Sequence, residues 1–318
     1  MELIRDLHNL RTSHRPCVAT IGNFDGVHLG HQAIIRQLRR HADEAGLPAV
    51  VITFEPQPLE FFAPQSAPAR LTPFREKLEL LCAAGVDRVF CLRFQQSLAS
   101  IPAETFVKEL LVDGLGIRRI VVGDDLRFGK GRAGDFNLLA RLGGECGFSV
   151  IPTETLYHGG ARVSSSRIRT FLAEGEFDEA ASLLGRAYYI SGRVMHGDKR
   201  GMGLGFPTAN IALKRKTSPL SGIYAVRVHG LHDRVYDGVA SIGTRPVFNG
   251  ETELLEVYLL DFNDTIYGRR IRVEFLKYIR PEQHFDSVDA LLERMRQDVT
   301  MAKEYFDNNN KAINVNQA

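Results

Sequence analysis

Residues 20–31 read TIGNFDGVHLGH, and this stretch decides the fold of the first half of the chain. The apolar run Cys17–Ile21 is typical of a buried strand, and an amphipathic helical pattern begins at Gln32. We therefore expect a strand, a glycine-rich turn and a helix. On that helix His28 and His31 would share one face, beside free backbone N–H groups and the positive end of the helix dipole. Such a corner suits a phosphate group.

The same stretch allows a purely structural interpretation. A glycine turn is common, and a single histidine at a helix start is more often a cap or a solvated side chain than a ligand. Here two histidines, one aspartate and three glycines fall within twelve positions. A structural turn does not require this combination, so the pattern favours a binding site.

The order Gly-x-Phe-Asp-Gly-x-His-x-Gly-His resembles the signature of the nucleotidyltransferase superfamily, in the version found in prokaryotic FAD synthetases. The resemblance implies that His28 and His31 are catalytic, because the family's histidines contact ATP phosphates and stabilise the charge that develops as pyrophosphate leaves. Histidine suits this role since it donates hydrogen bonds and can carry a proton near neutral pH. The ATP-binding residues implied in this stretch are Gly22, Phe24, Asp25, Gly26, His28 and His31.

The rest of the first half alternates between strand-like and helix-like segments. Apolar runs typical of buried parallel strands lie at 49–54, 86–94, 120–122 and 148–151. Helical spacing is found at 32–45, 73–84 and 103–111. This rhythm predicts an α/β domain with a Rossmann-like, doubly wound sheet, in which ligands bind beyond the carboxyl ends of the strands.

Two loops follow predicted strands at that edge, residues 54–58 and residues 123–134. Their alternating glycine, acidic and basic residues are also compatible with an ordinary surface loop. Both loops resemble family segments that line the flavin and nucleotide pocket, although the family usually has histidine at Gln57 and often phenylalanine at Leu126. The flavin-binding residues that the resemblance implies are Asn23, Pro56, Asp125, Phe128 and Arg132.

Residues 163–169, VSSSRIR, come just before a helical pattern over 170–184. Serines in this position cap helices, which accounts for at least one of them. Serine hydroxyls and arginine guanidinium groups at a helix N-terminus also hold triphosphate oxygens well. The segment resembles the family's Ser-Ser-Thr-x-x-Arg motif, with Ser166 in place of threonine. It implies that Arg169 is catalytic and that Ser164, Ser165, Ser166 and Arg169 bind ATP.

The second half has a different sequence pattern, in which short strand-like runs are separated by glycine. The runs lie at 189–194, 224–228, 235–242, 254–260 and 271–278, and a helical pattern follows at 287–306. Regular turn spacing favours a small closed β-barrel over an open sheet, with the last helix packed against it.

The most specific segment of the second half is residues 201–210, GMGLGFPTAN. A glycine-rich loop can simply be mobile, but mobility does not explain the Phe-Pro-Thr-Ala-Asn that ends it. This segment resembles the riboflavin kinase signature, which usually has arginine at Met202. Threonine and asparagine oxygens are suitable ligands for Mg²⁺, and the resemblance implies Thr208 and Asn210 as metal ligands. The ATP-binding residues it implies are Gly201, Gly203, Gly205, Pro207, Thr208 and Asn210.

Glu256 is a single carboxylate within the otherwise apolar strand pattern of 254–260. Strand alternation allows it merely to face solvent. By resemblance it is the catalytic base that takes a proton from the ribityl terminal hydroxyl of riboflavin. Residues 261–268 match the family's Asp-Phe-x-x-x-x-Tyr-Gly stretch, whereas Tyr258 stands where histidine is common. The chain has no Gly-x-x-x-x-Gly-Lys-[Ser/Thr] sequence, so a Walker-type kinase site is excluded.

The length and composition of the chain restrict the number of domains and the class of partner that it can have. The chain has 318 residues, 44% of them hydrophobic, which favours two domains, and its 40 basic and 38 acidic residues do not indicate nucleic-acid binding. No segment resembles a signal peptide or a membrane span, and the four cysteines lack metal or redox spacing. We expect a cytoplasmic protein with reduced, buried thiols, acting on small molecules as a monomer or weak homo-oligomer.

Motifs in both halves thus follow the order of the prokaryotic FAD synthetase family, whose members combine riboflavin kinase and FMN adenylyltransferase activities. The resemblance implies an adenylyltransferase domain at 1–184, a kinase barrel with its helix at 185–310 and a polar tail at 311–318. ATP, riboflavin, FMN and FAD would be substrates and products, with Mg²⁺ as cofactor. The alternatives are an adenylyltransferase of another acceptor and a flavin-binding module without catalysis.

Overall fold

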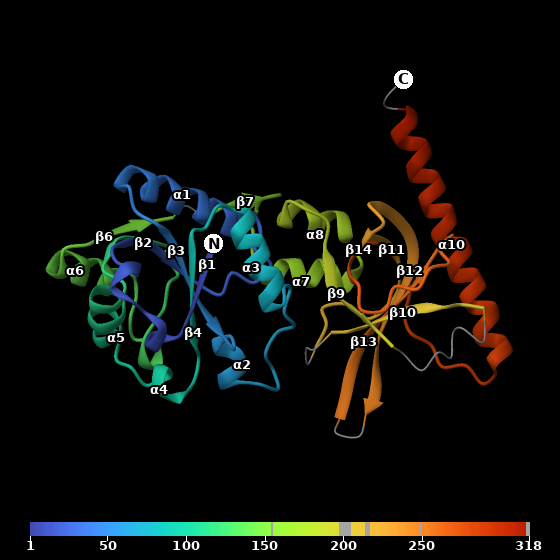
Figure 1. Ribbon diagram of the computed structural model, residues 1–318, viewed down its shortest axis with the longest axis horizontal. Helices are drawn as coiled ribbons and strands as arrows, with labels where there is room; N and C mark the ends of the chain where they lie inside the picture. Colours follow the sequence, from blue (N-terminus) through green and yellow to red (C-terminus); the bar gives the residue numbers. More distant parts are fainter. Residues whose placement is uncertain (154, 197–204, 214–216, 248–249, 316–318) are drawn as a thin grey trace. The chain divides into compact units, whose positions relative to one another are not determined.

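The structure is a computed structural model that describes residues 1–153, 155–196, 205–213, 217–247 and 250–315 (Figure 1). The chain divides into two compact units. The first unit comprises Met1–Pro68 and Thr72–Ser165, and the second comprises Ala69–Leu71 and Ser166–Ala318.

The first unit is built on a six-stranded parallel sheet in the order β1-β4-β3-β2-β5-β6. Its strands are β1 (Glu2–Arg5), β2 (Cys17–Ile21), β3 (Ala49–Glu55), β4 (Arg88–Arg93), β5 (Ile117–Val122) and β6 (Ser149–Pro152). The five strands predicted from apolar runs are confirmed. Strand β1 was not predicted, because a four-residue edge strand with a charge at each end carries no continuous apolar run.

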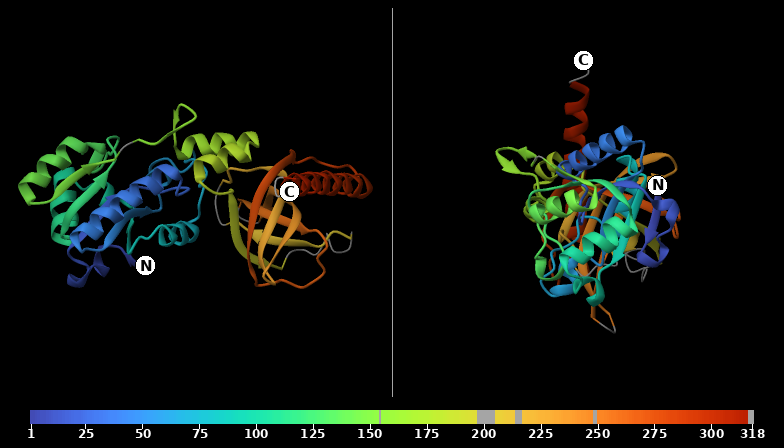
Figure 2. Two further views of the ribbon diagram at one scale, coloured as in Figure 1. Left: turned by 90° about the horizontal axis from the view of Figure 1, so that it is seen from above. Right: turned by 90° about the vertical axis from the view of Figure 1, so that its left-hand side faces the viewer.

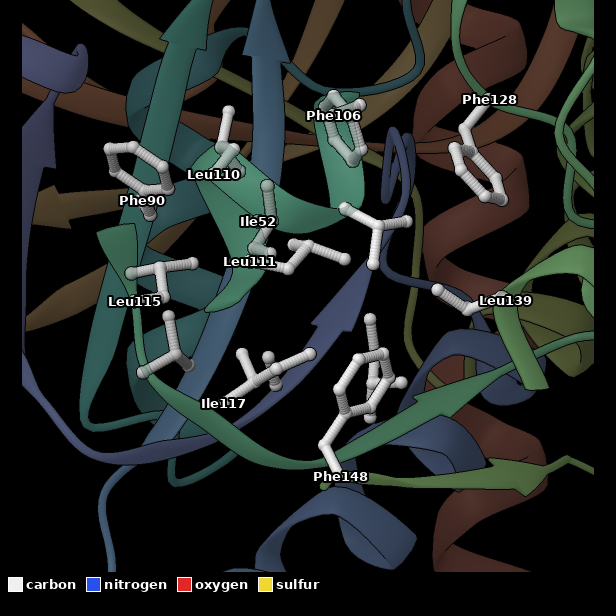
Figure 3. Packing of buried hydrophobic residues seen from close by; sticks show 14 of the residues in the cluster. Ile52, Phe90, Phe106, Leu110, Leu111, Leu115, Ile117, Phe128, Leu139 and Phe148 are labelled. Atoms are coloured by element: carbon white, nitrogen blue, oxygen red, sulfur yellow. The ribbon is translucent and has the colours of Figure 1, made fainter. Parts of the chain in front are cut away.

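Helices cover both faces of this sheet, as the doubly wound prediction requires. Strand side chains alternate between two cores: Val18 and Val51 face one core with α1, whereas Ala19 and Ile52 face the other. Figure 3 shows the second core, where Phe106, Phe128 and Phe148 pack among Leu and Ile side chains. The helical elements are η1 (Leu7–Asn9), η2 (Thr12–His14), α1 (Leu29–Ala45), α2 (Pro58–Phe62), α3 (Phe74–Ala83), α4 (Gln96–Ala99), α5 (Ala103–Thr105), the π-helix η3 (Phe106–Gly114), η4 (Lys130–Arg132) and α6 (Phe136–Cys146).

The second unit contains a closed antiparallel barrel in the order β10-β13-β12-β11-β14-β9. Its strands are β9 (Tyr189–Met195), β10 (Thr208–Ala212), β11 (Gly222–Leu231), β12 (Arg234–Val247), β13 (Gly250–Leu259) and β14 (Arg270–Arg280). The predicted barrel is confirmed, but strand β10 was not predicted, because its first residues were assigned to the motif at 201–210. Helix α10 (Val288–Val315) lies beside β11, β12 and β14 (Figure 2). It continues into the segment that we assigned to a polar tail.

The chain segment that follows β6 and precedes β9 differs from the prediction in one element. The single helix expected over 170–184 is two helices, α7 (Ser165–Glu174) and α8 (Phe177–Leu184). Gly175 separates them with φ 78°, a left-handed conformation that ends the first helix. The helices group with the barrel in the division into compact units, whereas the sequence boundary at 184/185 placed them with the first domain. A hairpin of two-residue strands, β7 (Tyr157–His158) and β8 (Ala161–Arg162), precedes them.

Candidate active sites

The helix that follows the central strand β2 begins on a histidine. His28 is the N-cap residue of α1, and its Nδ1 atom accepts a hydrogen bond from the backbone N–H of His31 at 3.3 Å. The His28 ring also stacks on the His31 ring, with centroids 3.6 Å apart and planes 16° from parallel. His28 therefore caps the helix and also stacks on His31, while phosphate binding by this pair remains a prediction.

Gly30 is explained by the ring of His28. A Cβ atom at Gly30 would lie 3.2 Å from both Cε1 and Nδ1 of that ring, closer than side chains normally pack. The glycine between the two histidines thus lets the capping ring lie flat against the first turn of the helix.

His31 lies between His28 and Phe24, whose ring centroid is 5.0 Å away. Burial holds the pKa of His31 well below its usual range, and the positive charges of His28, Lys77 and Arg162 lower it further. Among the described residues, none offers a hydrogen-bond partner to the buried Nδ1 atom of His31. The expected proton on this histidine is therefore disfavoured in the free protein, and one ring nitrogen is left for a ligand.

Asp25 holds the turn between β2 and α1. Its carboxylate Oδ1 accepts a hydrogen bond from the backbone N–H of Thr72 at 3.1 Å, and the Thr72 hydroxyl accepts from the N–H of Gly26 at 3.0 Å. The Ser165 hydroxyl donates to the carbonyl of Asp25 at 2.9 Å. Asp25 is only 3% exposed, so these bonds are made away from bulk solvent and fix the turn firmly.

The residues implied in flavin binding have differing surroundings. Phe128 is 8% exposed and packs against Phe106 in the core, with ring centroids 5.7 Å apart. Asp125 is paired with Arg162 at 2.6 Å on the surface, and Arg132 is exposed. The Asn23 carbonyl accepts from the Thr53 hydroxyl at 3.5 Å. Flavin contact by these residues and by Pro56 remains a prediction.

Gln57 has a feature that its sequence position alone did not reveal. It is 8% exposed, it is the N-cap residue of α2, and its backbone N–H donates to Glu60 at 2.8 Å. Its side-chain Nε2 is buried without a hydrogen-bond partner among the described residues. Since Gln57 follows the carboxyl end of β3, this amide is a candidate ligand contact.

The serine–arginine segment is divided between the two compact units. Ser165 belongs to the first unit, where it binds Asp25, and Ser164 is half-buried beside it in the chain. Ser166 and Arg169 belong to the second unit, and the Arg169 Nε donates to the Ala69 carbonyl at 2.5 Å. Their participation in ATP binding remains a prediction.

In the barrel, Asn210 on β10 and Glu256 on β13 are direct register partners, and Ser241 on β12 is the partner of Glu256 on its other side. The neighbouring residues Ile211, Leu255 and Ile242 are almost fully buried in the barrel interior. Because side chains alternate along strands, Asn210, Glu256 and Ser241 lie together on the outer face. The structure thus brings together the predicted base and a predicted metal ligand.

The rest of the barrel motif is described in part. Thr208 lies on β10 with its carbonyl accepting from the Asn210 amide at 3.1 Å, and Gly205 has φ 82°, which favours glycine. The predicted ATP-binding residues Gly201 and Gly203 lie outside the described residues. Phe206, next to Pro207, contacts the ring of Tyr258 with centroids 5.2 Å apart, so the unusual tyrosine packs on the same motif.

Two features near Glu256 were missed by sequence reasoning. Arg280, 7% exposed at the end of β14, forms a two-pronged ion pair with Asp298 of α10 at 2.8 and 2.7 Å. Glu282, two residues further on, hydrogen-bonds Ser241. The only local signal was the Arg-Pro-Glu that follows a strand, and pairing partners far along the chain cannot be found from one sequence.

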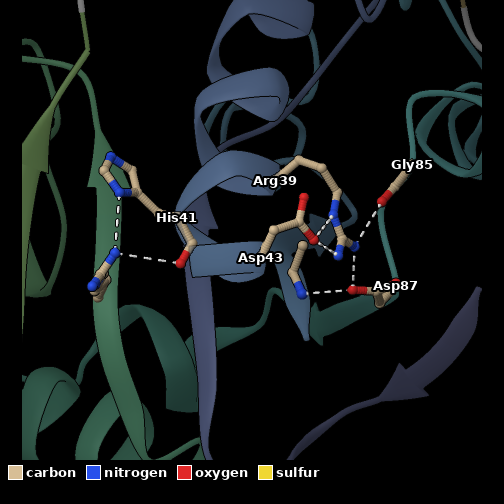
Figure 4. Close-up of polar contacts among 7 residues, drawn as sticks. Arg39, His41, Asp43, Gly85 and Asp87 are labelled. Carbon is tan, nitrogen blue, oxygen red and sulfur yellow. Dashed lines mark hydrogen bonds and ion pairs between the residues drawn. The ribbon is translucent and has the colours of Figure 1, made fainter. Parts of the chain in front are cut away.

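A polar network supports the other end of α1 (Figure 4). Arg39 donates to Asp43, to the carbonyl of Gly85 at 3.3 Å and to Asp87 at 2.5 Å. Asp87 also accepts from the backbone N–H of Ala49 at 2.8 Å. The hydrogen bonds with Asp43 and Asp87 raise the pKa of Arg39. Through Gly85 and Asp87 the network connects α1 to the turn before β4, and Asp87 connects that turn to the start of β3.

Comparison with known proteins identifies the family of each half of the chain. A family model described as FAD synthetase matches residues 10–167, and one described as riboflavin kinase matches residues 184–306. A bifunctional riboflavin kinase/FMN adenylyltransferase from Escherichia coli (strain K12) is 49% identical over 96% of this chain and 98% of its own length. The chain belongs to the bifunctional riboflavin kinase/FMN adenylyltransferase family.

A second relative and one solved structure are also similar to this chain over nearly its whole length. The relative from Pseudomonas fluorescens, with the same description, is 50% identical over 95% of this chain and 97% of its own length. A crystal structure described as a macrolide-efflux protein from Streptococcus pneumoniae superposes with a TM-score of 0.78 at 30% identity, covering 95% of this chain and 99% of its own. Within the described residues of this family member, no helix is long and apolar enough to cross a membrane.

The cysteines of this family member are all free, but not all are buried. Burial raises the pKa of Cys17 to about 12 and that of Cys91 to about 11. Cys82 is exposed, because it lies on the outer side of α3, so the expectation of buried thiols is wrong for this residue.

Proposed function

We propose that the chain phosphorylates riboflavin to FMN at the outer face of the barrel and adenylylates FMN to FAD at the N-terminus of α1. The family membership of the chain supports both activities. The assignment of each step to its residues rests on the two clusters described above.

In the adenylylation step, a phosphate oxygen of FMN attacks the α-phosphorus of ATP and pyrophosphate leaves. His28 and His31 would bind the phosphates of ATP at the start of α1, where backbone N–H groups and the helix dipole also favour negative charge. The buried Nδ1 of His31, for which the described part of the chain offers no hydrogen-bond partner, supports this role. Asp25 would act by holding the turn, since its carboxylate binds Thr72.

In the kinase step, the terminal hydroxyl oxygen of riboflavin attacks the γ-phosphorus of ATP, the bond to ADP breaks, and Glu256 takes the hydroxyl proton. The observation that carries this assignment is the register pairing of Glu256 with Asn210, which places a base next to a phosphate-binding motif. Alignment of the attacking oxygen and stabilisation of the transferred group would supply most of the rate.

Thr208 and Asn210 are suitable residues for Mg²⁺. The Asn210 amide nitrogen donates to the Thr208 carbonyl, which leaves the amide oxygen for another partner. The described residues contain no group of three or more His, Cys, Asp or Glu side chains that could hold a metal. Neutral oxygens from Thr208 and Asn210 would supply ligands to an ion that takes its other ligands from water and ATP phosphates, whose charge it would neutralise.

We also propose that the enzyme works in the cytoplasm on small molecules, as a monomer or weak homo-oligomer without nucleic-acid or membrane partners. The four free cysteines support a reducing compartment.

The Glu256→Gln variant tests the division of labour. Purified variant and unchanged protein are incubated with Mg-ATP and either riboflavin or FMN, and flavins are separated by chromatography. The amide cannot accept the proton, so FMN formation should fall at least about 100-fold while FAD formation from added FMN continues. Loss of both activities would contradict separate sites, and full retention of FMN formation would remove Glu256 from the mechanism.

A further inference from the structure

The core between the sheet and helices α1 and α3 becomes polar at one end. In its apolar part, Ile35 of α1, Leu81 of α3 and Val51 of β3 belong to one cluster, and all three are almost fully buried. Each helix connects neighbouring parallel strands, so both run opposite to the strands and point the same way. Side chains four positions apart share a helix face, so the residues one turn earlier, His31 and Lys77, lie at one level near the helix starts.

The sheet is also polar at this level. Thr53 of β3 and Cys91 of β4 are register partners, and each lies two residues beyond a member of the apolar cluster, on the same face of the sheet. Thr53 is fully buried, and Cys91 is 6% exposed. The charge of Lys77 acts on Cys91 as well as on His31, which agrees with a lysine side chain that lies over this part of the sheet.

The Lys77 side chain is fully buried, although lysine is rarely buried to this extent in proteins. Its helix is fixed to the turn before α1, because Thr72 accepts a hydrogen bond from the N–H of Gly26 at 3.0 Å and donates its own N–H to Asp25 at 3.1 Å. The backbone N–H of Lys77 donates to the carbonyl of Pro73 at 3.0 Å, at the start of α3. A buried positive charge is thus held on an element that is bonded to the start of α1.

We propose that Lys77 is a positioning residue of the adenylylation site: its buried positive charge acts on His31 from α3 and helps that ring to hold the phosphates of ATP as pyrophosphate leaves. This inference rests on the proposed role of His31. In the step concerned, a phosphate oxygen of FMN forms the new bond to the α-phosphorus, and the bond from the α-phosphorus to the pyrophosphate oxygen breaks. Negative charge then grows on pyrophosphate, and a fixed, buried positive charge stabilises it more than an exposed one does.

The charges around His31 explain why a second cation is useful there. Burial is the main reason that the pKa of His31 lies well below its usual range, and the charges of His28 on α1, Lys77 on α3 and Arg162 on β8 lower it further. Arg162 is exposed and paired with Asp125 at 2.6 Å, so solvent and this partner weaken its effect. Solvent does not screen the fully buried Lys77. Further titratable groups on the adjoining elements are Asp25 in the turn before α1, Glu55 on β3, Glu76 on α3 and Cys91 on β4.

The test compares two variants that remove the charge, Lys77→Met and Lys77→Gln, with the unchanged full-length enzyme. Arg75→Met removes an exposed cation from the same helix and is the matched control, since the Arg75 side chain is 71% exposed. Initial rates of FAD formation from FMN and Mg-ATP are measured from pH 6 to 9, with kcat and KM determined for each substrate. The titration of the His31 ring is followed by NMR, with His31→Gln to assign its signals.

At pH 8 both Lys77 variants should lower kcat/KM for ATP in FAD formation about tenfold, because a positive charge beside the phosphates has been removed. At pH 6 the loss should shrink to less than about threefold, because the His31 ring then binds a proton more easily and supplies a positive charge itself. For the same reason the midpoint of the His31 titration should move about one unit towards higher pH. Arg75→Met should change neither the rates nor the midpoint, and FMN formation from riboflavin should be the same in all variants.

A His31 midpoint that stays in place in both Lys77 variants would overturn the proposal, and so would a loss of FAD formation that is equal at pH 6 and pH 8. Normal FAD formation at pH 8 in Lys77→Gln would also overturn it, since that variant lacks the charge. If neither variant folds, as judged by circular dichroism, the charge serves the fold and the proposal is wrong. Failure of the underlying assignment is recognised separately, because His28→Ala/His31→Ala would then retain FAD formation.

Discussion

At the scale of single residues, the His28 ring both caps α1 and can bind a phosphate group. Its Nδ1 atom accepts the N–H of His31, so in the neutral ring the proton is on Nε2, which can donate to a phosphate. Because Asn is also a good N-cap residue, capping and ligand binding can be separated by substitution.

We expect His28→Asn to keep the unfolding free energy within about 0.5 kcal/mol of the unchanged protein, whereas His28→Ala should lose about 1 kcal/mol with the cap. Both variants should lose most FAD formation from FMN and keep FMN formation from riboflavin. Urea unfolding and flavin chromatography measure the two effects. Normal FAD formation in His28→Asn would show that the histidine only caps the helix.

His31 should make the stability of the first unit depend on pH. Its pKa in the folded protein lies well below the unfolded value near 6.5, so below that pH the unfolded chain binds more protons than the folded one. The free energy of unfolding should therefore fall as pH decreases from about 6.5, by at most about 1.4 kcal/mol per pH unit from this group.

The His31→Gln variant tests this prediction. Its stability should fall less between pH 7 and pH 5 than that of the unchanged protein, as measured by thermal unfolding at constant ionic strength. His8→Gln, at an exposed histidine, is the control and should leave the slope unchanged. An identical slope in both variants would assign the pH dependence to other groups.

At the scale of elements, α1 is held at both ends by side chains that serve different purposes. The start of α1 carries the histidines, and the network of Arg39 with Asp43, Gly85 and Asp87 fixes the region nearer its end. Arg39→Gln should lower the unfolding free energy by about 1 kcal/mol, because hydrogen bonds to charged and backbone groups are lost, without changing KM for ATP. Arg40→Gln on the same helix should change stability by less than about 0.5 kcal/mol, since its pair with Glu44 is long at 3.9 Å and exposed. Equal losses in the two variants would contradict the role given to the network.

The elements also show what a single sequence can predict. Strands such as β2 and β3 were found because each is a continuous apolar run buried on both faces. Strand β10 was missed because its residues Thr208 and Asn210 are polar, and pairing with β13 and β9 makes the segment a strand. The break at Gly175 was missed because a glycine is tolerated within a helical pattern, and its positive φ is a property of the fold.

The candidate sites divide in the same way. Short motifs predict roles for His28, His31, Thr208, Asn210 and Glu256, because the spacing of these motifs is local, and those roles remain predictions. Gln57, Ser241 and Glu282 have no such local signal, because their contacts are with residues that only the fold brings close to them. Flavin contact by Phe128 remains a prediction, and its low exposure and its packing on Phe106 are features of the fold that the local sequence does not show.

At the scale of the whole molecule, His28 and His31 belong to the first compact unit, and Asn210 and Glu256 belong to the second. Helix α8 belongs to the same unit as the barrel. Its residue Phe177 packs against Tyr224 and Phe275 of the barrel, with ring centroids 5.7 and 6.4 Å away. The second unit thus includes residues before 184, and its helices and strands share one core.

Separate sites should complement each other in solution. Neither Glu256→Gln nor His28→Ala/His31→Ala alone should convert riboflavin to FAD. An equimolar mixture should do so, because FMN released by the second variant can bind the first. Chromatography after incubation with Mg-ATP measures the yield, and FAD formation from added FMN by Glu256→Gln alone is the control. No FAD in the mixture, with the control active, would mean that FMN is not released between the steps.

The grouping of Ala69–Leu71 with the second unit has a consequence for synthesis of the chain on the ribosome. The carbonyl of Ala69 is bound by Arg169, a residue made 100 positions later. At about 5–20 residues per second, this carbonyl waits roughly 5–20 s for its partner. Nascent chains shorter than residue 169 should therefore be cut by proteases near residues 69–71, and the first unit becomes fully protected only when translation has entered the second.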